Sequence, residues 1–135
     1  MGPLARAGLG LAVLVLAACG TENAAGPASE PRTEVDVTVW PGGPASDPLT
    51  ASLTCDPEGG SHPDPAAACR ALDEDADALE PVPGDVACTE IYGGPDVARV
   101  RGKVNGSVVS ASFNRRNGCE IARWEALAPV LALSG

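Results

Sequence analysis

The stretch VARVRGKVNGSVVSASF (residues 97–113) has the pattern of a β-hairpin. The expected strands are Val97–Val104 and Val108–Phe113, two segments that are rich in valine and alternate between apolar and polar residues. Asn105-Gly106 lies between them, and both residue types tolerate the positive φ angles that a tight hairpin turn requires. The sequence therefore predicts an antiparallel sheet that contains this hairpin.

Further strands are expected on both sides of the hairpin in the sequence. Residues Thr33–Trp40 alternate between polar and apolar, which is the period of a strand with one buried face. Leu49–Cys55 can form a second, shorter strand, and Val130–Leu133 a final edge strand. With the hairpin, these segments predict a sheet of about five antiparallel strands.

Two short helices are predicted to pack on this sheet. Asp64 is the expected N-cap and Pro65 the first helical residue, so a helix is expected over Ala66–Leu79. A second helix is expected over Glu120–Leu127, ending near Pro129. The predicted fold class is α+β, a two-layer sandwich of one sheet and its helices.

The first residues have the features of a bacterial export signal. The apolar run Leu9–Leu16 follows a single cation, Arg6, and is too short to span a bilayer as a helix. It ends in Leu16-Ala17-Ala18-Cys19, which resembles the lipobox of bacterial lipoproteins, whose cysteine receives a diacylglycerol. The resemblance implies anchoring at the extracellular face of the membrane. Cleavage nearby without lipidation would instead release a freely secreted protein.

This interpretation divides the chain into three parts. Residues 1–18 are the expected lipoprotein signal peptide, residues 19–32 hold the lipidated Cys19 and a flexible tether, and residues 33–135 form one small domain. The tether is expected because residues 20–32 are small and polar and cannot form a core.

The chain is strongly acidic. Nine basic and 18 acidic residues give a formal net charge of −9, and loss of Arg6 with the signal peptide makes the mature chain −10. Phosphate binding needs clustered Lys and Arg, so the charge excludes nucleic acid as a partner. It also excludes adhesion to anionic lipid by charge, so the lipid on Cys19 is the one expected membrane attachment.

Four cysteines remain in the domain once Cys19 is assigned to the lipid. An even number of cysteines in a small exported domain predicts disulfides. Sequence alone allows three pairings of these cysteines, which are Cys55, Cys69, Cys88 and Cys119. A zinc site is excluded because no two of them are closely spaced and His62 is the only histidine. No metal or cofactor is expected, and the acidic run Asp73–Asp77 is interpreted as a solvated helix face.

The segment Cys88–Pro95 has the properties of an exposed, tethered loop. It lies between a proline-rich stretch and a strand, its β-branched residues favour an extended backbone, and Cys88 ties down one end. An extended segment fits a protease cleft by adding a strand to the enzyme. A rigid segment also loses less conformational entropy on binding than a flexible one. The segment is therefore predicted to bind a protease as an inhibitor and to perform no chemistry itself.

The same residues resemble the Streptomyces subtilisin inhibitor family. The resemblance covers about residues 33–133, and several separate motifs keep their order and spacing. These motifs are Cys-X-X-Ile-Tyr-Gly-Gly-Pro at 88–95, Asn117–Glu120, Leu53–Cys55, Gly60–Pro63, Pro65–Cys69 with Ala71-Leu72, and Ala122–Trp124.

The resemblance implies a serine protease inhibitor that forms a homodimer, sheet to sheet, with disulfides Cys55–Cys69 and Cys88–Cys119. The family's scissile bond lies two residues after the third domain cysteine, so the reactive-site bond maps to Glu90–Ile91. The residues expected to contact the protease around this bond are Cys88, Thr89, Tyr92 and Gly93. Asn117 matches the position that supports the loop from behind, where its amide can hydrogen-bond the loop backbone.

Glu90 departs from the Met, Lys or Arg that family members commonly carry before the scissile bond. A carboxylate is costly to bury in the apolar S1 pocket of subtilisin without a cationic partner. The expected partners are therefore extracellular serine proteases, either subtilisin-like or specific for glutamate. The alternative function is a lipid-anchored surface interaction module that has the inhibitor fold but no inhibitory activity. An enzyme is not expected, because His62 has no recognisable catalytic partners and is interpreted as a loop cap.

Overall fold

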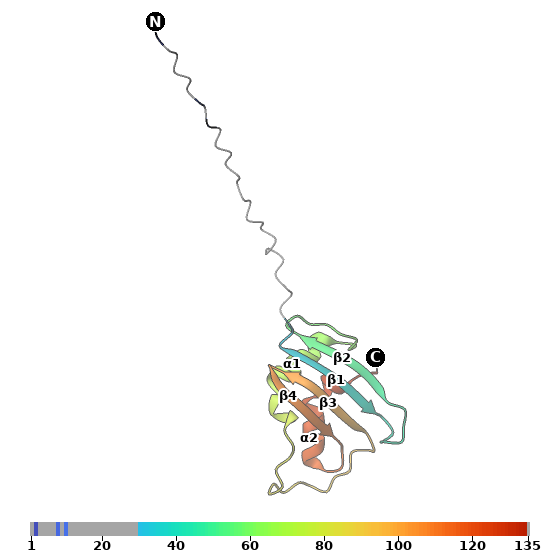
Figure 1. Cartoon of the computed structure of the whole chain (residues 1–135). Coiled ribbons are helices and arrows are strands. Elements are labelled where there is room, and N and C mark those ends of the chain that lie inside the picture. Colours follow the sequence, from blue (N-terminus) through green and yellow to red (C-terminus); the bar gives the residue numbers. More distant parts are fainter. Residues whose placement is uncertain (1, 3–7, 9, 11–29, 135) are drawn as a thin grey trace.

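Four antiparallel strands form one sheet in the order β2-β1-β3-β4 (Figure 1). The computed structural model describes residues 2, 8, 10 and 30–134. The strands are β1 (Thr33–Trp40), β2 (Leu49–Cys55), β3 (Val97–Val104) and β4 (Ser107–Phe113). Asn105 and Gly106 turn the chain between β3 and β4 with φ angles of 50° and 83°. The predicted hairpin is therefore confirmed.

The strand alternation places one face of the sheet in the core. Val35, Val37 and Val39 of β1 are buried, whereas the residues between them face solvent or are half-buried. Leu53 and Phe113, on the two outer strands, extend the same buried layer. Each fully buried side chain of this size contributes about 1.5–3 kcal/mol to folding. Because the chain has few aromatic residues, the valine-rich strands supply most of the core.

The helices all pack on the buried face of the sheet (Figure 1). They are α1 (Pro65–Glu74), the 3₁₀ helix η2 (Ala76–Leu79), α2 (Gly118–Ala126) and α3 (Ala128–Leu131). Asp64 caps α1, since its side chain accepts a hydrogen bond from the Ala67 N–H at 3.1 Å. The predicted helix over Ala66–Leu79 is divided at Asp75, whose N–H donates to the Ala71 carbonyl and ends α1.

The sheet has four strands, and the fifth strand expected at Val130–Leu133 is wrong. Ala128–Leu131 forms the single helical turn α3 instead, with Pro129 in its first turn. Proline suits this position because its fixed φ is helical and its missing N–H is not needed there. Val130 and Leu131 are buried against the helical layer, so their hydrophobicity serves the core without any strand pairing.

His62 ties the loop before α1 to this last turn. Its side chain is buried, with 4% of the residue exposed. Nε2 lies 2.9 Å from the Val130 carbonyl, and Nδ1 accepts a hydrogen bond from the Asp64 N–H at 3.0 Å. Since one ring nitrogen faces an acceptor and the other a donor, the geometry favours neutral imidazole with the proton on Nε2. The predicted role as a loop cap is consistent with these contacts.

Replacing His62 with alanine is expected to lower the free energy of unfolding by about 2–4 kcal/mol, because it leaves a cavity and two backbone groups without partners. Urea unfolding of the variant measures this loss. Arg70→Ala, at an exposed position of α1, is the control and should change stability by less than about 0.5 kcal/mol. A similarly small loss for His62→Ala would contradict the bridging role.

The predicted signal peptide, Cys19 and most of the expected tether lie outside the described residues. Within the described part of the chain, no helix combines the length and the apolar character needed to cross a bilayer.

Candidate functional site

The chain between η2 and β3, residues 80–96, contains no helix or strand and forms a long loop at one end of the domain (Figure 1). It enters β3 at Val97, which pairs with Trp40 at the end of β1. The loop therefore lies at the opposite end of β1 from Thr33, where the domain begins. Ile91 and Tyr92 leave 59% and 67% of their surface exposed on this loop. Two adjacent, exposed large apolar side chains suggest a binding surface.

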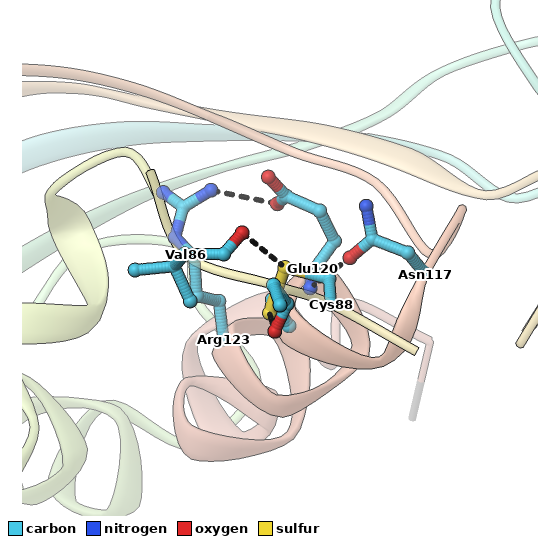
Figure 2. The surroundings of a disulfide bond; sticks show 7 residues. Val86, Cys88, Asn117, Glu120 and Arg123 are labelled. Carbon is cyan, nitrogen blue, oxygen red and sulfur yellow. Dashed lines mark hydrogen bonds and ion pairs between the residues drawn. A yellow bond between two sulfur atoms is a disulfide. The ribbon is translucent and has the colours of Figure 1, made fainter. Parts of the chain in front are cut away.

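A disulfide ties the start of this exposed segment to the first turn of α2 (Figure 2). Cys88 and Cys119 are bonded, with their Cα atoms 5.4 Å apart. The other bond, Cys55–Cys69, joins the end of β2 to α1. Both pairs are those that the family resemblance implied.

Two backbone hydrogen bonds hold the segment on either side of its tip. The Gly118 N–H donates to the Thr89 carbonyl at 2.9 Å, and the Gly93 N–H donates to the Arg115 carbonyl at 2.7 Å. In the described part of the chain, the backbone groups of residues 90–92 make no hydrogen bond. The structure thus braces both flanks of Glu90, Ile91 and Tyr92 and leaves the backbone of these three residues free to pair with a partner.

Asn117, the residue expected to support the loop, caps α2 and makes no direct hydrogen bond to the loop in the described part of the chain. Its Oδ1 accepts from the Glu120 N–H at 2.9 Å, which makes it the N-cap of α2 (Figure 2). The expected bond from its amide to the loop backbone is not among the hydrogen bonds of the described residues. An amide at this position satisfies the free N–H groups of the first helical turn, and this turn holds Gly118 and Cys119 against the loop.

Arg123 fixes α2 to the rest of the domain. Its Nε donates to the Ala78 carbonyl at 3.0 Å, and one terminal nitrogen donates to the Ser112 carbonyl at 3.2 Å and to Glu120 at 2.8 Å. Its guanidinium also lies 4.7 Å from the centre of the Phe113 ring. Because Cys119 of α2 is bonded to Cys88 of the loop, these contacts connect the loop to the core through α2.

Sequence reasoning identified the exposed residues and the disulfide but missed the two backbone braces. Arg115 acts there through its main-chain carbonyl, which every residue has, and Gly118 through its main-chain N–H, which every residue except proline has. The nearby Gly118 is close-packed, since a Cβ atom at this position would meet the Thr89 side chain. The glycine before Cys119 was the available signal for this close approach.

Among the described residues, no group of three His, Cys, Asp or Glu side chains is placed to hold a metal ion. His62 uses both ring nitrogens within the fold. Cys19, the expected lipidation site, lies outside the described residues.

Comparison with known proteins matches this chain to a family model and to several solved structures. The model of the family described as Subtilisin inhibitor-like matches residues 31–117. Streptomyces caespitosus sermetstatin, solved in complex with Bacillus licheniformis subtilisin, is 26% identical to this chain. The match covers 73% of this chain and 96% of that one, with a TM-score of 0.48. Among curated proteins, none matches this sequence.

Proposed function

The chain belongs to the subtilisin inhibitor-like family, and from this premise we propose that it inhibits serine proteases by offering residues 88–93 to the cleft in the manner of a substrate. Membership of an inhibitor family places the chain among binding proteins and not among enzymes. The observation that carries the proposal is the exposed tip Glu90–Tyr92, held between two hydrogen bonds and beside a disulfide.

The braces explain how a substrate-like segment can inhibit. Free backbone groups at the tip can pair with the edge of a protease cleft. The flanking residues are already fixed to α2 and to residue 115, so little further ordering is needed on binding. The reactive-site bond is proposed to be Glu90–Ile91, with Cys88, Thr89, Tyr92 and Gly93 in contact with the enzyme.

Glu90 is proposed to select the target. Its side chain is exposed, so it enters the pocket of the protease that receives the residue before the scissile bond. An apolar pocket would have to bury a carboxylate without a partner, whereas a pocket with a cationic or hydrogen-bonding group would satisfy it. The best target is accordingly an extracellular protease with glutamate specificity, and subtilisin is bound less tightly.

Titration of the chain from residue 20 against subtilisin and a glutamyl endopeptidase tests this function. Stoichiometric inhibition of both enzymes, tighter for the glutamyl endopeptidase, is the expected result. Rapid cleavage at Glu90–Ile91 without inhibition of either would reject it and favour the surface interaction module.

Anchoring at the cell surface is proposed from the sequence Leu16-Ala17-Ala18-Cys19 alone. A lipidated inhibitor would protect the surface of its own cell, whereas a secreted one would act in the medium. Mass spectrometry of the mature N-terminus should find a diacylglyceryl group on Cys19. An unmodified terminus beyond Cys19 would show free secretion instead.

A homodimer is proposed through the outer face of the sheet. Apart from Trp40, Val97 and Val108, this face is mostly polar. It has an acidic row on β1 beside a basic row on β3, where Asp36 lies opposite Arg101 and Glu34 opposite Lys103. A two-fold axis parallel to the strands and between these rows would place the basic row of one copy over the acidic row of the other. Such a dimer depends on charge and should weaken at high salt.

Sedimentation equilibrium at low and high ionic strength tests the dimer. Asp36→Arg should weaken it, and adding Arg101→Asp should restore it, because the exchanged charges remain complementary. A chain that stays monomeric at low ionic strength would contradict the arrangement.

A further inference from the structure

The two sides of the reactive loop are held by bonds of different kinds. On the side before Glu90–Ile91, Cys88 is covalently attached to α2. On the side after it, residues 91–96 continue into β3 but contain no disulfide, and they depend on contacts with residue 115 and its surroundings. This difference has a mechanistic meaning only in an inhibitor, so the role of these contacts rests on the proposed function.

Arg115 makes several of the contacts on the side after the bond, where the Ile121 side chain of α2 also lies close to Gly93. Its carbonyl accepts the Gly93 N–H at 2.7 Å. Its guanidinium lies 3.9 Å from the Asp96 carboxylate, and a Cβ atom built at Gly93 would lie 3.2 Å from the Arg115 Cβ. Arg115 therefore contacts the loop at two points, three residues apart.

The guanidinium is itself held in place by α2. It lies 5.7 Å from the centre of the Trp124 ring, and its Nε is buried without a hydrogen-bond partner among the described residues. Charge and stacking thus fix this side chain, and a planar cation is suited to both. Trp124, Arg115 and Asp96 form a chain of contacts from the helix to the loop.

We infer that Arg115 is a positioning residue that keeps the cleaved end of the loop in place for religation. When the protease serine attacks the Glu90 carbonyl carbon, an ester forms, and the Glu90–Ile91 C–N bond breaks. The nitrogen of Ile91 takes a proton and becomes a free amine. In the reverse step this amine attacks the ester carbon, the serine oxygen leaves with a proton, and the intact inhibitor is restored.

The position of the new amine decides between this reversal and hydrolysis. Glu90 stays near the enzyme through its ester and through Cys88. Ile91 is only two residues from Gly93, whose N–H is held by the Arg115 carbonyl. A fixed amine acts at a high effective concentration and competes with water for the ester. If Arg115 releases the segment, Ile91 stays joined to β3 through residues 92–96, but its amine is no longer fixed beside the ester and water completes the cleavage.

Three variants of the chain from residue 20, assayed with subtilisin, test this inference. Arg115→Ala removes the ion pair and the stacking, Arg115→Lys keeps the charge, and Asp96→Asn removes only the ion pair. Arg116→Ala, at the exposed neighbouring position, is the matched control. The measurements are the lifetime of the complex, the ratio of cleaved to intact inhibitor at equilibrium, and the melting temperature of the free protein.

Arg115→Ala is expected to raise the rate of release of cleaved inhibitor by about tenfold, while the rate of association changes by less than about threefold. Arg115→Lys and Asp96→Asn should show intermediate effects, and Arg116→Ala should behave as the wild type. A purely structural role would lower the melting temperature and leave the cleaved fraction unchanged.

Equal complex lifetimes and cleaved fractions for Arg115→Ala, Asp96→Asn and Arg116→Ala would overturn the inference and leave the proposed function intact. Failure of the wild-type chain to inhibit subtilisin and a glutamyl endopeptidase would overturn both.

Discussion

Replacing Glu90 with leucine should tighten the inhibition of subtilisin by about a hundredfold, because an apolar side chain replaces a carboxylate whose burial costs several kcal/mol. Inhibition of a glutamyl endopeptidase should weaken by a comparable factor, since the group that its pocket recognises is removed. Inhibition constants for both enzymes, measured with the same protein preparation, give the two factors.

A glutamate-to-leucine substitution outside the loop shows whether a change in inhibition comes from the protease pocket or from the loss of one negative charge. Glu58 is exposed in the loop after β2, and Glu58→Leu should leave both constants unchanged. Glu90→Lys should move the preference toward trypsin-like enzymes. If Glu90→Leu and Glu90→Lys have the inhibition profile of the wild type, then Glu90 does not precede the reactive-site bond.

Loss of the Cys88–Cys119 bond should convert the inhibitor into a substrate. In the variant with serine at both positions, residues 88–92 lose their covalent attachment to α2. Ordering several backbone residues on binding costs about 1–2 kcal/mol each, so the complex with subtilisin should weaken by about a hundredfold or more. The stability of the free protein should fall by about 3–4 kcal/mol. Enzyme inhibition and mass spectrometry of the cleaved chain measure the change.

The second disulfide supplies the control for this experiment. Serine at both Cys55 and Cys69 should cost about 3 kcal/mol of stability but leave the cleavage rate of the loop unchanged, since that bond joins β2 to α1. If the two double variants are cleaved at the same rate below their melting temperatures, global stability and not the local tie protects the loop.

The strands could be predicted because their signals are local. The alternation over Thr33–Trp40 is enough to specify one strand and the side chains of that strand that face the core. The turn residues Asn105-Gly106 specify the two strands of the hairpin. The last turn, Ala128–Leu131, could not be predicted in this way. A four-residue apolar segment fits a strand or a helix equally well, and the outcome depends on burial of Val130 and Leu131 against the helical layer.

The candidate site shows the same division. The exposure of the segment Cys88–Pro95 was predicted from its residue types, whereas the disulfide pairing and the position of Glu90–Ile91 were expected from the family resemblance. The bonds from Gly118 to Thr89 and from Gly93 to Arg115 join main-chain atoms that are distant in sequence. Gly118 signals a close approach, but no residue type identifies Thr89 or Arg115 as the partner, so only the folded backbone could place these pairs. Asn117 was expected to support the loop directly, whereas its cap on α2 depends on where the helix begins.

If the chain is anchored as proposed, the direction of β1 sets the distance between the start of the domain and the reactive loop. The polypeptide enters the domain at Thr33, and the loop meets the sheet at the other end of the same strand, where Trp40 pairs with Val97. Eight strand residues span about 26 Å. A membrane-attached chain would therefore carry Glu90–Ile91 at the end of the domain opposite its point of attachment, where an approaching protease need not collide with the lipid headgroups.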